Sequence, residues 1–264
     1  MATTRQPSVA GLFYPADPET LAKQVHGYLA AATAPGPSEP PPKAVIAPHA
    51  GYVYSGPIAG SAYARITPLA GRITRVILLG PTHRVAIRGL AYSRADRFLT
   101  PLGSIPVDRK ALASLADLPQ VAESDIPFEG EHCLEVQLPF LQLTLGNFSL
   151  VPLLVGDAGA EEVAEVLARL WGGDETLIVI SSDLSHYLDY RRAQAMDAET
   201  SQAIEALRPE DIDYHAACGR NPVSGLLTEA RRRGLHAHTL DLRNSGDTAG
   251  PKDRVVGYGA YALA

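Results

Sequence analysis

Short apolar runs rich in β-branched residues, separated by stretches with helical spacing, constrain the fold more than any other feature of this sequence. Runs that are apolar on both faces are typical of buried parallel strands. The chain contains four of them, at residues 44–47, 75–79, 149–155 and 176–180. Their alternation with helices predicts an α/β fold, a single three-layer domain in which helices flank a central, mostly parallel sheet.

Capping and spacing signals place the helices around these strands. Asp17-Pro18-Glu19 is a helix start, because a capping aspartate precedes a proline at the first helical position. The last predicted helix begins in the same way, with Asn221 as its cap and Pro222 after it. Apolar spacing predicts helices near residues 18–32, 56–66, 133–145, 159–171, 191–207 and 222–233.

Two further segments complete the expected organisation. Residues 34–43 are rich in proline, which disfavours both helix and sheet, so they predict a surface loop. The 33 residues before that loop are too few for a domain, so we expect one domain over residues 1–264. Residues 255–261 alternate with period two and predict an edge strand.

Composition and missing motifs exclude several classes of function. Lys and Arg number 23 and Asp and Glu 29, and the net charge of −6 disfavours non-specific nucleic-acid binding. Two cysteines cannot form a disulfide framework, no apolar stretch approaches the ~20 residues of a membrane span, and the start lacks the apolar core of a signal peptide. We therefore expect a cytoplasmic protein that binds neither nucleic acid nor membrane. The chain also lacks a phosphate loop, a dinucleotide fingerprint and a Gly-x-Ser-x-Gly elbow, which argues against nucleotide-dependent and serine-hydrolase chemistry.

Histidines follow three of the predicted strands. His49 comes after Val45-Ile46-Ala47-Pro48, His83 after Leu79-Gly80-Pro81-Thr82, and His186 after the strand that ends near Ser181. In an open parallel sheet the carboxyl ends of all strands lie at one edge, where ligands bind. A lone histidine after a strand is usually structural, whereas three at equivalent strand ends indicate a shared site. Imidazole nitrogen suits zinc, copper and iron, so the sequence predicts a metal centre.

Asp183 and Cys218 are the two candidates for a further metal ligand. Asp183 lies on the same turn as His186, and its alternative role is to cap a turn or helix. Cys218 lies before a predicted helix and beside Arg220, which predicts a lowered thiol pKa and an accessible thiolate. The alternative for Cys218 is a small buried apolar residue.

A second polar cluster lies at residues 129–135, Glu-Gly-Glu-His-Cys-Leu-Glu. Its spacing differs from that of a zinc protease motif, in which two histidines lie four apart around a glutamate. We interpret the cluster as a solvated helix start, with His132 as a candidate to line the cleft.

The strings Ala47-Pro48-His49-Ala50-Gly51-Tyr52, Leu79-Gly80-Pro81-Thr82-His83, Ser181-Ser182-Asp183-Leu184-Ser185-His186 and Cys218-Gly219-Arg220-Asn221-Pro222 resemble the Memo family, called AmmeMemoRadiSam system protein B in prokaryotes. Further matches are Ala10-Gly11-Leu12-Phe13-Tyr14 and the run from Glu131 to Phe140. The motifs occur in order over nearly the whole chain, and their combination is specific.

The resemblance implies the fold of the class III (LigB-type) non-haem iron extradiol dioxygenases. His49 and His83 match the two metal-binding histidines, and Cys218 stands where those dioxygenases have a carboxylate. His186 matches the acid/base position with Asp183 beside it, and Phe13 replaces a tryptophan of animal relatives at the cleft mouth. A thiolate is softer than a carboxylate, which shifts metal preference toward copper or zinc.

Two hypotheses of function follow. The first is a metal-dependent redox enzyme, similar to a dioxygenase, that holds iron or copper (or zinc) at His49, His83 and Cys218 and uses His186 and Asp183 in catalysis. The second is a non-catalytic protein whose vestigial cleft, lined by Phe13, Tyr54 and His132, binds a peptide or small ligand. Animal Memo proteins bind phosphotyrosine peptides, and the family association implies AMMECR-type and radical-SAM proteins as partners.

Overall fold

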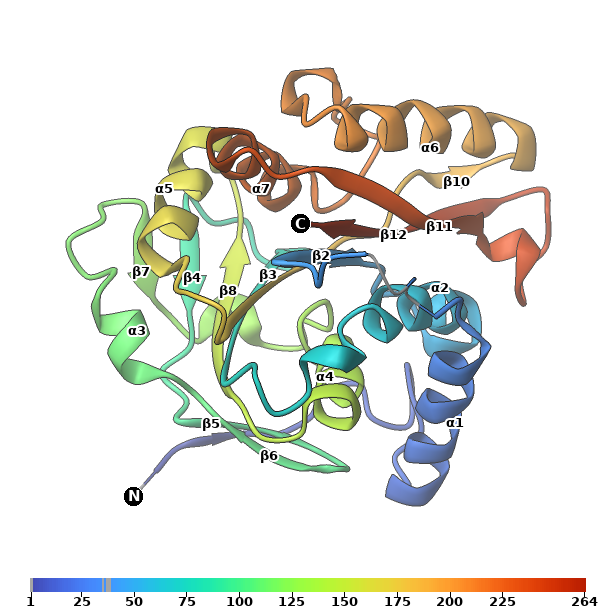
Figure 1. The fold of residues 1–264 in the computed structure, drawn as a ribbon. Helices are drawn as coiled ribbons and strands as arrows, with labels where there is room; N and C mark the ends of the chain where they lie inside the picture. The colour runs from blue at the N-terminus through green and yellow to red at the C-terminus, as the bar shows by residue number, and fades with distance from the viewer. Residues whose placement is uncertain (1, 35, 37–38) are drawn as a thin grey trace.

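A large mixed sheet forms the centre of the molecule, with helices on both sides (Figure 1). The computed structural model describes residues 2–34, 36 and 39–264, so Pro35, Pro37 and Ser38 of the predicted proline-rich loop lie outside the described residues. The other residues of that loop carry neither helix nor strand. The helices are α1 (Pro18–Ala31), α2 (Tyr52–Ala64), α3 (Arg109–Ala113), α4 (Leu138–Leu145), α5 (Ala160–Leu170), α6 (Tyr190–Glu205) and α7 (Arg220–Arg233).

The strands form two sheets. The large sheet has the order β10-β12-β2-β9-β3-β8-β4-β7, with β11 also paired to β12, and the small sheet has the order β1-β5-β6. The central strands of the large sheet, β2, β9, β3 and β8, are parallel to one another. The pairings of β12 with its neighbours, and the pairing of β4 with β8, are antiparallel. The bounds are β1 (Thr4–Arg5), β2 (Ala44–Ala47), β3 (Arg75–Pro81), β4 (Leu90–Tyr92), β5 (Arg97–Thr100), β6 (Gly103–Pro106), β7 (Val121–Glu123), β8 (Ser149–Val155), β9 (Thr176–Ser181), β10 (His186–Leu188), β11 (Ala237–Asn244) and β12 (Val255–Leu263).

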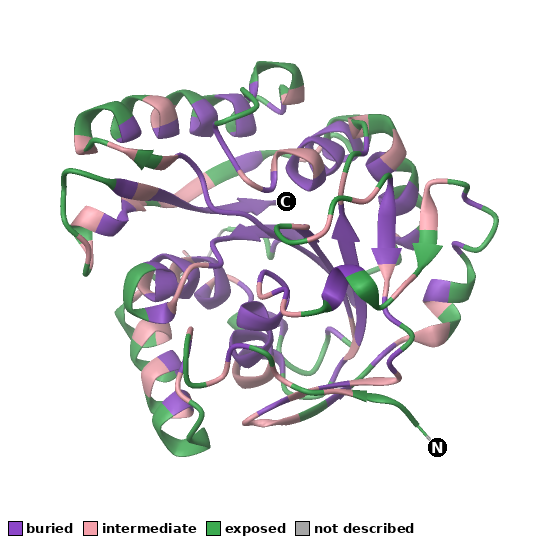
Figure 2. Ribbon diagram, turned by 180° about the vertical axis from the view of Figure 1, so that it is seen from behind, coloured by how far each residue is buried: buried purple, intermediate pink, exposed green. Residues whose placement is uncertain are grey.

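The parallel core explains why the apolar runs were recognisable as strands. Every residue of β2 and of β9 is buried, and only the first residue of β3 and of β8 is partly exposed. Figure 2 shows this burial as a continuous band through the sheet. Helices α5, α6 and α7 lie on one side, and α1, α2 and α4 on the other (Figure 1). The expected three-layer α/β fold is confirmed.

The helix starts follow the capping chemistry only in part. Asp17 accepts a hydrogen bond from the backbone N–H of Thr20 and caps α1, as predicted. Helix α7 begins at Arg220 with Gly219 as its cap, so the prediction of Asn221 as the cap is wrong. The Asn221 amide donates instead to the Gly156 carbonyl at 2.7 Å, which attaches the start of α7 to the end of β8.

The position of β12 also differs from the prediction of an edge strand. It pairs with β11 along one side and with β2 and β10 along the other. Its alternation arises from small residues rather than from one solvated face, because α2 and α6 pack against the two faces. Gly257 shows how closely they approach, since a Cβ added there would lie 2.0 Å from a carboxylate oxygen of Asp197 on α6.

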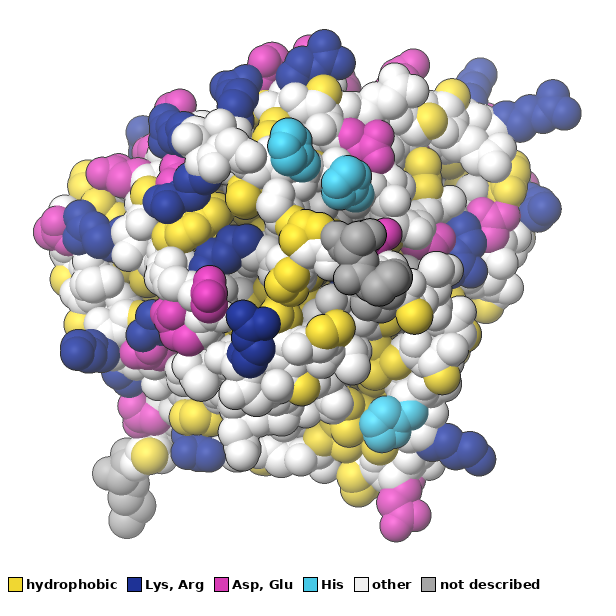
Figure 3. Space-filling view, in the orientation of Figure 1, with side chains coloured by type: hydrophobic (Ala, Val, Ile, Leu, Met, Phe, Trp, Pro, Cys, Tyr) yellow, Lys and Arg dark blue, Asp and Glu magenta, His cyan; other side chains and the backbone are white. Residues whose placement is uncertain are grey.

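Charges on the face drawn in Figure 3 are mixed, with Lys and Arg interspersed among Asp and Glu. Within the described residues, no helix is both long enough and apolar enough to cross a membrane.

Candidate metal centre

Three strand ends bring the predicted residues to one place. His49 lies two residues after β2, His83 two residues after β3, and Asp183 two residues after β9, which runs between those strands. The ring centroids of His49 and His83 are 5.1 Å apart. The expected convergence of these two histidines at the carboxyl edge of the sheet is therefore present.

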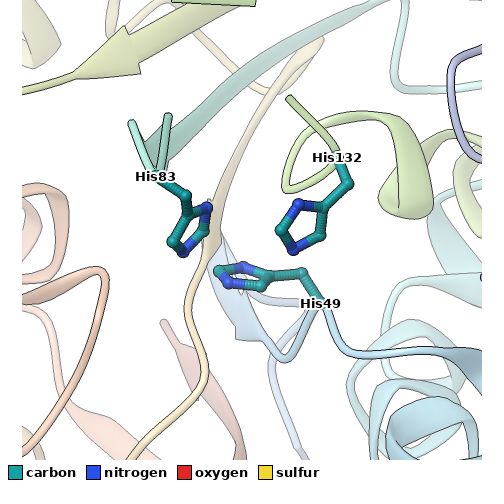
Figure 4. A group of neighbouring side chains, drawn as sticks. All are labelled: His49, His83 and His132. Atoms are coloured by element: carbon teal, nitrogen blue, oxygen red, sulfur yellow. The ribbon is translucent and has the colours of Figure 1, made fainter. Parts of the chain in front are cut away.

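His132 joins the two strand-end histidines, and we call this set the three-histidine group. Its ring centroid lies 5.5 Å from that of His49 and 4.9 Å from that of His83. One ring nitrogen from each of the three side chains lies within 4.8 Å of the others. Figure 4 shows the three rings, carried by three separate loops, facing a common space. Sequence reasoning gave His132 a place in the cleft but not in a donor set.

The hydrogen bonds of Ser181 determine the protonation of His49. The Ser181 hydroxyl donates to the Cys133 carbonyl at 2.6 Å and accepts from the Gln137 amide at 2.8 Å. Because a hydroxyl has one proton, its contact of 2.9 Å with His49 Nδ1 must be one in which the ring N–H donates. Nε2 of His49 then carries a free lone pair, as a metal ligand requires. Burial and the neighbouring imidazoles lower the pKa of His49 well below its ordinary value, so the ring is neutral.

Glu131 orients His83 in the same way. Its carboxylate accepts from His83 Nδ1 at 3.0 Å and from the His83 backbone N–H at 2.7 Å. Burial works to raise the pKa of Glu131, but the hydrogen bonds and charge interaction with His83 outweigh it and hold the pKa well below its usual range. A carboxylate that accepts from Nδ1 leaves Nε2 free, which is the usual outer arrangement around a metal-binding histidine. His132 Nδ1 lies 3.3 Å from the same carboxylate.

The interpretation of the cluster at residues 129–135 as a solvated helix start is wrong for Glu131. That side chain is buried beneath His83 and His132 rather than exposed. The sequence shows only that Glu131 precedes a histidine, His132. Its hydrogen-bond partner His83 lies 48 residues away, so the sequence did not reveal their contact. Cys133 follows it as a buried thiol that donates to the Pro81 carbonyl. His83, Glu131 and Cys133 form a second group of potential donors.

Cys218 contacts His49 from the start of α7. Its Sγ lies 3.2 Å from His49 Nε2, but it is not part of the three-donor groups found among the described residues. Metal–nitrogen bonds of about 2.0 Å and metal–sulfur bonds of about 2.3 Å place two donors roughly 3–4 Å apart on one ion, so this spacing fits a shared ion. The predicted lowering of the thiol pKa is wrong. Burial, together with the Asp183 carboxylate, raises the pKa of Cys218 well above its ordinary value.

Asp183 holds the turn that carries His49. Its carboxylate accepts from the His49 backbone N–H at 2.7 Å, which is the turn-capping role weighed as an alternative. Its own backbone carbonyl accepts from the Cys218 N–H at 3.3 Å. Burial raises the pKa of Asp183 to about 7, whereas hydrogen bonds from the backbone N–H groups of His49 and Ala50 work to lower it. Asp183 thus links the loops of His49 and Cys218 and carries a carboxyl group that is half protonated near neutral pH.

His186 lies beside the three-histidine group rather than within it. It is partly buried at the start of β10, near enough to His49 and His83 for their charges to interact. Burial lowers its pKa, so the imidazole is neutral at pH 7. The next residue, Tyr187, has a φ of 62°, a left-handed conformation that is strained in a residue with a bulky side chain.

Aromatic side chains surround the group. The ring of Phe13 lies 4.6 Å from that of His132, and Tyr54 is 40% exposed. Tyr54 and Tyr187 both lie near the buried Tyr258, whose pKa is raised by burial first and also by Asp183. Tyr258 was not predicted as part of the site, although the period-two pattern of its segment placed it on a strand.

Comparisons with known proteins agree with these motifs. A family profile described as "Memo-like protein" matches residues 5–262. A protein of Aeropyrum pernix named "MEMO1 family protein" is 38% identical over 284 residues, which cover 98% of this chain and 99% of that protein. Proteins of the same name from Thermotoga petrophila and Sulfolobus acidocaldarius are 35% and 34% identical, each over 96% of this chain and 97% of their own length.

Proposed function

Since the chain belongs to the Memo family, we propose that it is a metal-dependent redox protein whose three-histidine group, with Cys218, binds iron or copper. The observation that supports this proposal is the fixed orientation of the rings. His49 Nδ1 is held by Ser181 and His83 Nδ1 by Glu131, so that both Nε2 atoms carry no proton and are able to bind an ion. Such outer contacts are typical of metal-binding histidines, because they fix the tautomer and the orientation of the ring.

The donor set fits a redox-active ion. His49 and His83 are the two ligands expected from the family resemblance, and His132 and Cys218 supply the further donors that the geometry places beside them. Imidazole suits iron, copper and zinc, while a thiol shifts the preference toward the softer of these ions. A bound iron or copper ion supplies one-electron transfer to a substrate.

The remaining residues of the site bind substrate and move protons. His186 is neutral at pH 7 because burial lowers its pKa, so its imidazole accepts a proton from an acidic hydroxyl of a bound substrate. Asp183 keeps the loops of His49 and Cys218 in place. Phe13 and Tyr54 form the apolar contacts at the mouth, and Phe13 also limits the access of water to His132.

Metal analysis of protein prepared without oxygen tests the proposal. Wild-type protein is expected to hold close to one iron or copper per chain, and His49→Ala and His83→Ala are expected to lose it. His132→Ala and Cys218→Ala then show which further donor the ion uses. His236→Ala, an exposed histidine far along the chain, is the matched control. Wild-type stoichiometry in both His49→Ala and His83→Ala contradicts the proposal.

The exposed side chains at the mouth favour a second candidate, a protein that binds a peptide or small ligand without turnover. Leu12 is 80% exposed beside Phe13, and Tyr187 is 62% exposed beside His186. Oxygen uptake with a catechol discriminates the two functions. Uptake that disappears in His186→Ala supports the redox protein. Ligand binding that a chelator leaves unchanged, without uptake on any catechol, supports the binding protein.

A further inference from the structure

A cavity of about 470 Å³ reaches the candidate metal centre at Cys218, although none of the three histidines lines it. It lies between the ends of β3 and β8 and the start of α7, and its walls include Thr82, Val155, Tyr214 and Cys218. Its volume falls within the roughly 300–1,000 Å³ typical of small-molecule sites. Because Cys218 is 3.2 Å from His49 Nε2, a ligand in this cavity lies next to the proposed metal donors.

Arg220 is the basic side chain of this cavity, and it lacks a protein acceptor. Its Nε is fully buried without a hydrogen-bond partner, and none of the ion pairs among the described residues includes Arg220. Its guanidinium lies 5.8 Å from the centre of the Tyr214 ring. Since the side chain of Arg220 lines the cavity and donates to no acceptor in the described part of the protein, its guanidinium donors are available to an acceptor on a ligand.

The other arginines of α7, unlike Arg220, form ion pairs. Arg231 pairs with Glu210, Arg232 with Glu161 and Glu229, and Arg233 with Glu229. All three lie in the last turn of the helix, whereas Arg220 begins it. The start of α7 is held in place independently, by the bond of Asn221 to the Gly156 carbonyl. Arg220 is therefore not needed to fix the helix.

We propose that Arg220 binds the oxyanion of a small organic acid, a carboxylate or a phosphate, in this cavity. The rest of that molecule extends past Cys218 toward the three-histidine group. This inference rests on the proposed function, because it assigns the substrate of the same site to the class of small anions. A guanidinium presents paired donors that match both kinds of oxyanion.

Asp157 is an exposed residue at the rim of the cavity, and it allows a test in which the direction of the effect is predicted. Its carboxylate repels an anion bound nearby. Removing this charge is expected to tighten the binding of an anion, whereas removing that of Arg220 is expected to weaken it. A site that binds by apolar contact alone would respond to neither change.

Titration of ¹⁵N-labelled protein with inorganic phosphate, and separately with benzoate, tests the inference by NMR. Shifts are expected at residues lining the cavity, with a Kd that rises at least tenfold in Arg220→Gln and less in Arg220→Lys. Asp157→Asn is expected to lower the Kd several-fold, and Arg191→Gln, an exposed arginine on α6, to leave it unchanged. The two probes show which oxyanion the cavity prefers.

Two outcomes overturn the inference, an unchanged Kd in Arg220→Gln and the absence of shifts with both probes in the wild type. Metal content measured on the same samples separates this failure from that of the proposed function. Wild-type metal content without anion binding contradicts the cavity alone. Anion binding that depends on Arg220, in protein without metal, contradicts the metal centre alone. Arg220→Gln with wild-type circular dichroism and metal content excludes misfolding as the cause.

Discussion

Glu131 receives four hydrogen bonds, from the ring and backbone of His83 and from the backbone N–H groups of His132 and Cys133. Two loops that carry donor histidines are thus attached to one carboxylate. Since the partner of Nδ1 decides which nitrogen of an imidazole is free, Glu131 controls the availability of His83 Nε2.

Glu131→Gln is therefore expected to weaken metal binding by about 10- to 100-fold, the usual cost of altering an outer partner of a ligand. An amide no longer provides two equivalent acceptor oxygens to the four donors. Competition with a chromogenic chelator measures the affinity. Glu129→Gln, an exposed neighbour, is the control and is expected to match the wild type. Equal affinities in the two variants would show that Glu131 has only a structural role.

Asp197 is a buried residue of α6 whose carboxyl group contacts the segment just before His186. It accepts from the Ser185 backbone N–H at 3.0 Å and packs against the backbone at Gly257. Burial raises its pKa from 3.8 to about 6, against the hydrogen bond from Ser185. The folded protein therefore keeps this proton between about pH 4 and 6, where the unfolded chain releases it.

This difference predicts the direction of a pH effect. The stabilising contribution of Asp197 is fully present below about pH 4 and is lost as the pH rises through 6, by up to about 3 kcal/mol. Urea denaturation of the wild type and of Asp197→Asn at pH 4, 5, 6 and 7 measures it. Relative to the variant, the wild type is expected to lose free energy of unfolding as the pH rises. A constant difference over this range contradicts the prediction.

At the scale of elements, the contact between β9 and the start of α7 positions Cys218. The Gly219 backbone N–H donates to the Ser182 hydroxyl at 3.0 Å. A Cβ at Gly219 would lie 2.6 Å from the Ser182 side chain and 2.9 Å from the Ser181 carbonyl. The turn before α7 approaches the strand end this closely only because residue 219 has no side chain.

Gly219→Ala is expected to lower the free energy of unfolding by about 1–3 kcal/mol, the usual cost of overpacking, and to move Cys218 away from His49. Gly27→Ala is its control, because a Cβ at Gly27 on α1 meets no atom within 4 Å. That change is expected to stabilise the protein by about 0.5–1 kcal/mol through helix propensity. Urea denaturation compares the two. Similar changes in both variants would show that the approach at Gly219 is not tight.

The elements that the sequence predicted best are those with the same apolar surroundings on both faces. Strands of the parallel core are buried on both faces, so their apolar runs needed no knowledge of their partners. The place of β12 depended on which helices cover it, and the start of α7 on the Gly156 carbonyl contacted by Asn221. Both are contacts between distant segments, which periodicity does not reveal.

The residues of the site show the same difference: topology predicts some of their positions, and contacts between distant segments decide the others. His49 and His83 were predictable as neighbours because the carboxyl ends of parallel strands lie at one edge of a sheet, although β9 runs between β2 and β3. The position of His132 depends on the course of a long loop, and its grouping with them was not predictable. The pKa of Cys218 depends on burial that the motif does not encode, and so its predicted direction was wrong.

Over the whole molecule, the donors come from segments between residues 49 and 218, so a bound ion stabilises the fold by joining them. Fe²⁺ added without oxygen, at about 100 times its Kd, is expected to raise the free energy of unfolding by about 2.7 kcal/mol. Thermal unfolding with and without the ion measures this effect, and His83→Ala is expected to show none. A wild-type protein that gains no stability from Fe²⁺ or Cu²⁺ contradicts the prediction.

The internal position of β12 has a consequence for synthesis of the protein. The four candidate metal donors all precede β12 in the chain and leave the ribosome before it, yet β2, which leads into His49, pairs with β12 through residues 44–46. Until β12 emerges, the nascent chain presents β2 with an open edge, of the kind that invites pairing with other chains. A chain synthesised only as far as Cys218 therefore has an unpaired edge of β2 next to the loop of His49, and it is more exposed to aggregation than the folded protein.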